Sequence, residues 1–145
     1  MDIQIVEGSL QEALTVLRKL PEFDKMQTDE YYIEKIGDRQ PLILLAMLGS
    51  ELIGCKVGYN RYKDGSFYSA LGGVLPAHRQ SGIARRLADA QEIWAKEKGY
   101  ESIKFKTLNR HKNMIIFAIK NGFSLYNIKP KDELEHYRIE MIKNL

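Results

Sequence analysis

The stretch HRQSGIARRL, residues 78–87, combines residue types that suit the binding of an anion. Arg79 precedes Gly82 by three residues, and Arg85 follows where an apolar helical periodicity begins. The first turn of a helix offers unpaired backbone N–H groups and the positive end of the helix dipole. Glycine allows a close approach of the backbone to a ligand, and arginine adds positive charge. The stretch therefore predicts a site for an anion, and phosphate is the favoured one, at a helix N-terminus.

Hydrophobic periodicity and turn residues predict the elements that position this stretch. The expected strands are residues 3–7, 42–48, 52–60, 67–75, 101–108, 123–128 and 134–142, and the expected helices are 9–20, 28–36, 80–98 and 111–122. Antiparallel strands followed by a strand–helix–strand unit predict an α/β fold with a mixed central sheet and helices on both faces. The anion turn then follows the C-terminal end of a central strand, where open α/β sheets bind ligands.

Length and composition predict one domain, residues 1–145. No apolar run approaches the roughly 20 residues of a membrane span, and the N-terminus has no basic start and apolar core of a secretory signal. The single cysteine, Cys55, has no partner for an intrachain disulfide. We expect a cytoplasmic protein that does not interact with membranes.

The net charge of +3 is distributed unevenly. Residues 1–75 hold 8 Lys and Arg against 11 Asp and Glu, whereas residues 76–145 hold 14 against 8. The alternatives are a solvated surface of uneven charge and a second half that binds an anionic ligand. The basic residues form no run and no nucleic-acid motif accompanies them, so we do not expect nucleic acid as a partner.

The segment VLPAHRQSGIARRL, residues 74–87, resembles the acetyl-CoA-binding motif of the GNAT superfamily of N-acetyltransferases. In that family a Val-x-Pro approach precedes Arg/Gln-x-x-Gly-x-Gly/Ala. The matching residues are Val74, Pro76, Arg79, Gly82 and Ala84. The tripeptide at 121–123, Asn-Gly-Phe, matches the end of the helix that follows in the family, and the order of elements agrees from residue 3 to residue 142.

The resemblance implies a single-domain GNAT fold with acetyl-CoA as co-substrate and no metal. The backbone from Gln80 to Arg85 would bind the pyrophosphate, and Gly72, Gly73 and Val74 would present strand backbone to the pantetheine arm, unless the two glycines only form a bulge. For Arg79, contact with a phosphate and bracing of the turn remain open. The expected cofactor-binding residues are Gly72, Gly73, Val74, Arg79, Gln80, Ser81, Gly82, Ile83, Ala84, Arg85 and Asn109.

The family's activity implies transfer of the acetyl group to a primary amine of a small molecule or peptide, by direct attack in a ternary complex. The sequence departs from the family at three positions. Ala118 stands where many members have a tyrosine acid, and His111 stands in place of an asparagine, which Asn109 replaces only if two residues are inserted. The central strand, residues 67–75, has no glutamate base.

Three groups can take over parts of the chemistry. Tyr126 and Tyr68 are candidate acids, and the backbone N–H of Val74 is a candidate donor to the oxyanion. We expect an ordered water to accept the proton of the amine. The alternative to an enzyme is an acyl-CoA-binding protein of the GNAT fold with a sensing or regulatory role and little catalysis.

Acidic residues of the first two helices and the last strands favour a cationic amine as acceptor, with solvated helix faces as the alternative. They are Asp24, Asp29, Glu30, Glu34, Glu135 and Glu140. The resemblance also implies that a homodimer can form, although the sequence indicates no interface.

Overall fold

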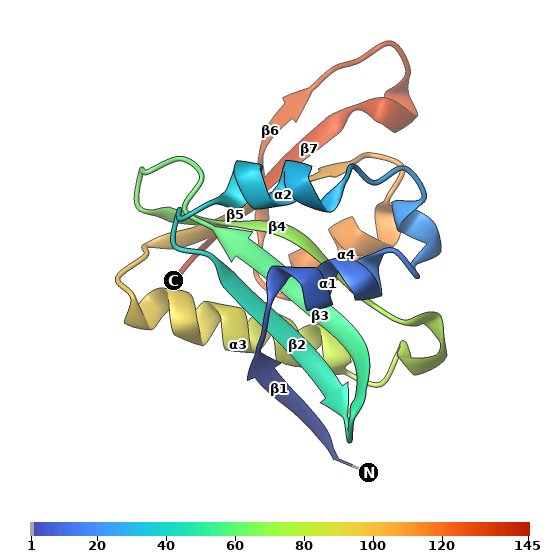
Figure 1. The fold of residues 1–145 in the computed structure, drawn as a ribbon. Helices are drawn as coiled ribbons and strands as arrows, with labels where there is room; N and C mark the ends of the chain where they lie inside the picture. Colours follow the sequence, from blue (N-terminus) through green and yellow to red (C-terminus); the bar gives the residue numbers. More distant parts are fainter. Residues whose placement is uncertain (1) are drawn as a thin grey trace.

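A seven-stranded mixed sheet with the order β1-β2-β3-β4-β5-β7-β6 organises the computed structural model, which describes residues 2–145 (Figure 1). The strands are β1 (Ile3–Glu7), β2 (Leu42–Leu48), β3 (Glu51–Tyr59), β4 (Ser66–Val74), β5 (Ser102–Leu108), β6 (Ser124–Lys129) and β7 (Arg138–Asn144). Only β4 and β5 pair in parallel, and every other neighbouring pair is antiparallel.

Two helices lie on each face of the sheet, as expected (Figure 1). One face carries α1 (Leu10–Leu17) and α2 (Asp29–Ile36), and the other carries α3 (Ile83–Glu97) and α4 (Lys112–Lys120). Three short 3₁₀ turns complete the fold: η1 (Pro21–Phe23), η2 (Pro76–His78) and η3 (Leu134–His136). The predicted α/β class, with a mixed central sheet and helices on both faces, is confirmed.

Local sequence signals account for the start of α1. The side chain of Ser9 accepts a hydrogen bond from the backbone N–H of Glu12, and the Glu12 carboxylate accepts one from the backbone N–H of Ser9, both in the capping-box pattern. The apolar stripe behind this cap, which includes Leu14 and Leu17, is buried against the sheet. This helix therefore holds the segment that follows it over the middle of the sheet.

Three predicted elements have a boundary that is wrong by three residues or more, and the first is α1, which ends at Leu17 rather than at residue 20. Helix α3 begins at Ile83 rather than at residue 80, because Gln80 (φ +63°) and Gly82 (φ +82°) adopt left-handed backbone conformations. The last strand spans Arg138–Asn144 rather than 134–142, because Leu134–His136 forms a 3₁₀ turn. This strand lies between β5 and β6, so the end of the chain extends the sheet beyond the parallel pair.

Within residues 2–145, no helix is long and apolar enough to cross a membrane. In the same part of the chain, no three side chains of His, Cys, Asp or Glu gather in a way that could hold a metal ion.

Candidate active site

The parallel pairing of β4 with β5 is short. Ser66–Tyr68 pairs with Ser102–Lys104, and β4 then continues to Val74 while β5 continues to Leu108 beside β7. In the described part of the chain, this edge of β4 therefore has no partner strand beyond Tyr68. Backbone amides along it can pair with an extended ligand that carries amides of its own.

Backbone direction places N–H groups on this open edge. The N–H of Leu75 donates to the carbonyl of Ile53 on β3 at 2.8 Å. Because N–H directions alternate along a strand, the N–H groups of Val74 and Gly72 face away from β3. They are thus oriented toward the open edge, as the predicted oxyanion role of Val74 requires.

The turn before α3 presents a series of free donors. No hydrogen-bond acceptor within residues 2–145 binds the backbone N–H of any residue from Gln80 to Arg85, and the first helical bond runs from Arg86 N–H to Gly82 O at 3.1 Å. A Cβ built on Gly82 would meet no atom within 4 Å, so the space beside it is open. Six successive free donors at the start of a fifteen-residue helix are a site for an anion.

Arg79 fastens this turn to two other segments. Its Nε donates to the carbonyl of Val74 at 2.9 Å, and its Nη1 and Nη2 lie 2.7 Å and 2.9 Å from the two carboxylate oxygens of Glu22 in η1. The guanidinium lowers the pKa of the Glu22 carboxyl. Of the two roles left open for Arg79, bracing is the one that these contacts support.

Basic and aromatic side chains surround the point where β4 and β5 diverge. Lys104 and Lys106 alternate with Ile103 and Phe105, whose side chains pack toward α3 and α4. The two lysines therefore face the side of the sheet that α1 and α2 cover. They lie over the ring of Tyr62, at 5.3 Å and 5.9 Å from its centroid.

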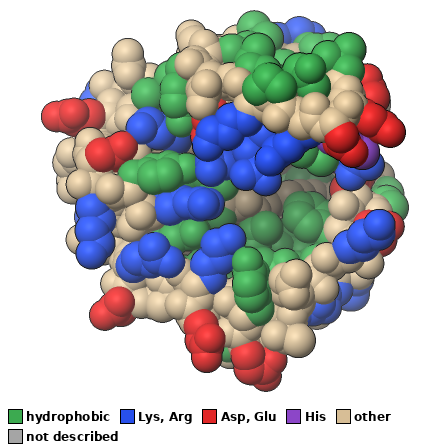
Figure 2. Space-filling view, turned by 90° about the horizontal axis from the view of Figure 1, so that it is seen from above, with side chains coloured by type: hydrophobic (Ala, Val, Ile, Leu, Met, Phe, Trp, Pro, Cys, Tyr) green, Lys and Arg blue, Asp and Glu red, His purple; other side chains and the backbone are tan. Residues whose placement is uncertain are grey.

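Seen from the end that carries β6 and β7, basic side chains gather beside a hollow bordered largely by hydrophobic ones (Figure 2). Arg61 lies over the rings of Tyr62 and Tyr68, at 5.4 Å and 4.8 Å. We define the acceptor-side basic cluster as Arg61, Lys104, Lys106, Lys129 and Arg138. The cluster and the turn before α3 lie near opposite ends of β4.

The two candidate tyrosines also lie near the divergence. Tyr68 is the last residue of β4 that pairs with β5, and burial raises the pKa of its phenol. Tyr126 is half exposed on β6 with Lys104 at 5.6 Å from its ring, and partial burial raises the pKa of its phenol, with Glu140 adding to the effect. Both phenols therefore stay protonated near neutral pH.

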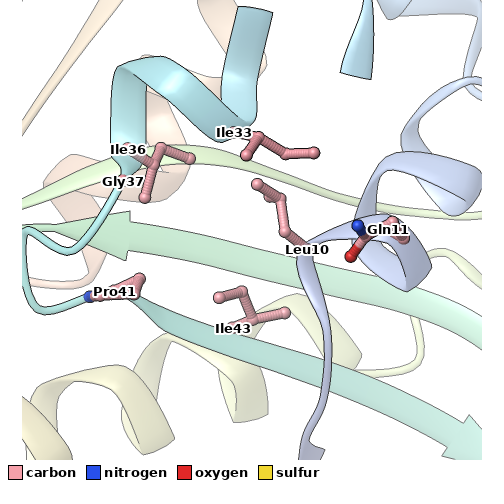
Figure 3. A pocket seen from close by; sticks show the side chains of 7 residues that line it. All are labelled: Leu10, Gln11, Ile33, Ile36, Gly37, Pro41 and Ile43. Atoms are coloured by element: carbon pink, nitrogen blue, oxygen red, sulfur yellow. The ribbon is translucent and has the colours of Figure 1, made fainter. Parts of the chain in front are cut away.

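A separate groove of about 320 Å³ lies between α1, α2 and the start of β2. Figure 3 shows apolar side chains such as Leu10, Ile33 and Ile43 bordering it, and Gln11 is its most polar side chain. None of its lining residues is ionisable, and none belongs to the turn or to the basic cluster. This groove has no chemistry of its own.

The sequence model of the acetyltransferase (GNAT) family matches residues 10–123. The chain belongs to the acetyltransferase (GNAT) family. The matched range includes α1, the open edge of β4, the turn before α3 and the whole of α4. The predicted family and the predicted enzyme class are confirmed. No curated protein sequence matches this chain closely enough to count as a relative.

Solved structures of acetyltransferases share the fold of this GNAT acetyltransferase. The ribosomal-protein-S18-alanine N-acetyltransferase from Escherichia coli superimposes with a TM-score of 0.83 at 13% identity, over 99% of this chain and 94% of that one. A GNAT family acetyltransferase from Elizabethkingia anophelis, with acetyl-CoA bound, gives 0.79 at 18% identity, over 99% and 98%. A Bacillus subtilis acetyltransferase in complex with CoA gives 0.76 at 17%, over 99% and 97%.

Several predicted cofactor residues of this GNAT acetyltransferase make contacts within the protein. The guanidinium of Arg85 donates hydrogen bonds to the side chain of Asp89 on α3 and to that of Asn121 at the end of α4. The amide of Asn109 donates to Leu134 O at 3.1 Å and accepts from Lys112 Nζ at 2.8 Å. Asn109 therefore ties the β5–α4 turn to the segment before β7.

The two glycines of β4 do not form the bulge considered above, because the register shift between β3 and β4 lies at Val57 and Gly58 instead. A Cβ on Gly73 would lie 2.2 Å from Leu20 Cδ1, so this glycine makes room for the end of the α1 segment. A Cβ on Gly72 would lie 3.2 Å from the Cys55 carbonyl. Both residues lie on the open part of β4, as predicted, and their role toward the cofactor stays a prediction.

Ala118 stands where the family resemblance implies a tyrosine acid, and it lies in the core. Ala118 is buried on α4, so no phenol extends from that position. His111 precedes α4, where burial and Arg110 lower its pKa while Glu22 opposes them. Neither position therefore carries the tyrosine or the asparagine that the family resemblance implies.

The acceptor-side basic cluster was not predicted from the sequence. The alternation in SIKFKTL could have indicated it, because Lys104 and Lys106 fall on one face of a strand. Among the acidic residues expected to favour a cationic amine, Glu140 lies 3.7 Å from Lys106 Nζ and 3.9 Å from Lys129 Nζ, so both lysines already balance its charge.

Proposed function

We propose that this protein transfers the acetyl group of acetyl-CoA to a primary amine, within a ternary complex and without a covalent enzyme intermediate. The proposal rests on one observation: a turn with free backbone donors directly follows a strand edge that has no partner within residues 2–145. Six free backbone donors from Gln80 to Arg85 suit a pyrophosphate, and the unpaired edge of β4 suits an arm that carries amides. The acetyl-CoA and CoA bound to similar solved structures support the same donor.

The proposal gives the cofactor a direction along β4. With its pyrophosphate at the turn, the pantetheine arm follows β4 backwards from Val74 toward Tyr68. The thioester then lies near the divergence of β4 and β5. The N–H groups of Gly72 and Val74 line the start of this path, where they can pair with amides of the pantetheine arm, and the oxyanion role of Val74 stays a prediction.

The reaction forms a C–N bond and breaks a C–S bond. A neutral amine attacks the thioester carbonyl, and the tetrahedral intermediate then expels the CoA thiolate. One proton leaves the nitrogen to water, which we expect to be its acceptor, and the thiolate takes a proton from solvent or from a phenol. Tyr126 and Tyr68 stay candidates for that donor, since both lie near the divergence with raised pKa values.

The first test compares the unfolding midpoint with and without acetyl-CoA. A ligand at 100 times its Kd adds about 2.7 kcal/mol to the free energy of unfolding, so the midpoint should rise by several degrees. Dephospho-CoA separates the 3′-phosphate from the pyrophosphate as the source of the rise. Release of the CoA thiol in the presence of a panel of amines then measures transfer.

The outcomes separate two functions. Stabilisation together with amine-dependent thiol release supports the acetyltransferase. Stabilisation without release for any amine would favour the alternative, a protein that binds acyl-CoA for sensing or regulation. An unchanged midpoint in a folded sample contradicts both. Dimer formation, expected from the family resemblance, stays a prediction that light scattering in solution tests.

A further inference from the structure

The acceptor-side basic cluster holds more positive charge than its surroundings balance. Lys104 Nζ lies 2.9 Å from an Asp64 carboxylate oxygen, and Lys106 and Lys129 share the carboxylate of Glu140. Within residues 2–145, no carboxylate lies within 4 Å of the guanidinium of Arg61 or of Arg138. Five cations thus face two carboxylates, which leaves an excess of three positive charges.

This crowding does not serve the stability of the fold. The side chain of Lys106 is only 15% exposed. Burial lowers its pKa, and Arg61, Arg138 and Lys129 lower it further, while Glu140 opposes them. Like charges brought together at a partly buried place raise the free energy of the folded chain. Such an arrangement is expected where a ligand supplies the missing negative charge.

The cofactor cannot supply that charge, because its phosphates belong at the other end of β4. Tyr68 marks the cluster and Val74 precedes the turn, six residues further along the strand. At about 3.3 Å per residue this is roughly 20 Å. The cluster instead surrounds the end of β4 where the proposed thioester meets its acceptor.

Aromatic side chains fix the cations in place. The guanidinium of Arg61 packs on Tyr68 and Tyr62, and Lys104 lies between the rings of Tyr62 and Tyr126. The planar guanidinium of arginine can bind a carboxylate or a phosphate through two parallel hydrogen bonds. The cluster is therefore suited to a compact anion held at a defined distance from the thioester.

We propose that the acceptor amine carries an anionic group, a carboxylate or a phosphate, which Arg61 and Arg138 of the acceptor-side basic cluster bind. This proposal rests on the proposed function and replaces the cationic amine expected from the sequence. The same cations disfavour a second positive charge nearby and so lower the pKa of the bound ammonium. They thereby raise the fraction of neutral, nucleophilic amine at a site whose strand has no glutamate base.

The test measures kcat/KM for matched acceptors that differ in one group. Butylamine, 4-aminobutyrate and 1,4-diaminobutane compare a neutral, an anionic and a cationic tail, and ethanolamine against O-phosphoethanolamine compares hydroxyl with phosphate. Charge-assisted hydrogen bonds are worth about tenfold to a hundredfold in binding. We expect the anionic acceptors to exceed their neutral counterparts by at least about tenfold.

Substitutions test whether the acceptor-side basic cluster causes the preference for anionic acceptors. Arg61→Gln and Arg138→Gln should each remove most of the preference for the anionic tail while leaving the KM for acetyl-CoA unchanged. Lys96→Gln, an exposed substitution on α3 at the opposite face, is the matched control and should keep the preference. Circular dichroism shows whether each variant is folded, and the two arginine variants are independent of each other.

If none of these acceptors is acetylated, their binding can still be measured. Calorimetric titration of 4-aminobutyrate and O-phosphoethanolamine into the CoA-saturated protein should show binding that Arg61→Gln weakens at least about tenfold. Equal binding by the wild type and both arginine variants, or a preference for the diamine, overturns the inference and leaves acetyl transfer intact. Failure of acetyl-CoA to bind is a separate result that contradicts the proposed function.

Discussion

At the scale of single residues, Gly82 is one of two left-handed positions in the turn before α3. Its φ of +82° disfavours any side chain, and the space where a Cβ would point is open. Gly99, at the other end of α3, has the same two properties, with φ +91° and no atom within 4 Å of an added Cβ. The two glycines differ in the proposed function, which places the pyrophosphate beside Gly82 and no ligand beside Gly99.

Gly82→Ala and Gly99→Ala should therefore cost similar stability but differ in binding. Each left-handed alanine costs about 1–2 kcal/mol of unfolding free energy. Only the methyl group at residue 82 lies where the proposed function places a phosphate, so Gly82→Ala should weaken acetyl-CoA binding at least about tenfold. Thermal unfolding and calorimetry measure the two effects. Equal acetyl-CoA affinity in both variants would show that no phosphate of acetyl-CoA binds at this turn.

At the scale of elements, the short pairing of β4 with β5 is reinforced at its closed end by Asp64. One carboxylate oxygen accepts from the backbone N–H of Ser66 at 2.9 Å and from its hydroxyl, and the other lies 2.9 Å from Lys104 Nζ. Hydrogen bonds from Ser66 and then from Lys104 lower the pKa of Asp64 from 3.8 to about 2. The ionised carboxylate thus links the turn before β4 to β5.

This shift predicts how stability depends on pH. Because the pKa of the folded state is the lower one, the contribution is present above about pH 4 and is lost as the pH falls from about 4 toward 2. Asp64→Asn should therefore lower the unfolding midpoint at pH 6 and have little effect near pH 2. The side chain is 42% exposed, so the loss should not exceed about 1 kcal/mol.

The control for this prediction is Asp38→Asn, an exposed carboxylate with no ion pair among residues 2–145. Its unfolding midpoint should follow that of the wild type over the whole range from pH 6 to pH 2. If Asp64→Asn follows the wild type equally well, the carboxylate does not link β4 to β5.

At the scale of the whole molecule, the sequence predicted the parts that depend on neighbours along the chain. The turn at Gly82 and the helical periodicity that begins after it are local patterns, and the structure contains both. The fold class followed from the order of such patterns along the chain. The start of α3 was wrong by three residues because a left-handed residue at Gln80 leaves no periodic signal.

The acceptor side could not be predicted in the same way. Its cluster joins Arg61 from a loop, Lys104 from β5 and Arg138 from β7, which become neighbours only because β7 inserts between β5 and β6. Strand order of this kind depends on contacts between distant parts of the chain. Charge counts for the two halves of the sequence therefore could not show which basic residues gather at one place.

The Arg79–Glu22 pair joins residues 57 positions apart and connects the two sides of the proposed site. Glu22 belongs to the segment between α1 and α2, and Arg79 to the turn that the pyrophosphate would contact. Arg79→Gln removes both this pair and the bond to Val74 O, so the turn loses its support, and acetyl-CoA affinity should fall about tenfold.

Glu22→Gln removes the ion pair alone, and this separates the two roles of Arg79. Both side chains are about two-fifths exposed, so the loss of stability should stay below about 1 kcal/mol. If Arg79 braces the turn through Val74 O, calorimetry should give an acetyl-CoA affinity within about twofold of the wild type. If Arg79 instead contacts a phosphate, release from Glu22 should tighten binding by a larger factor, because the carboxylate no longer competes for the guanidinium.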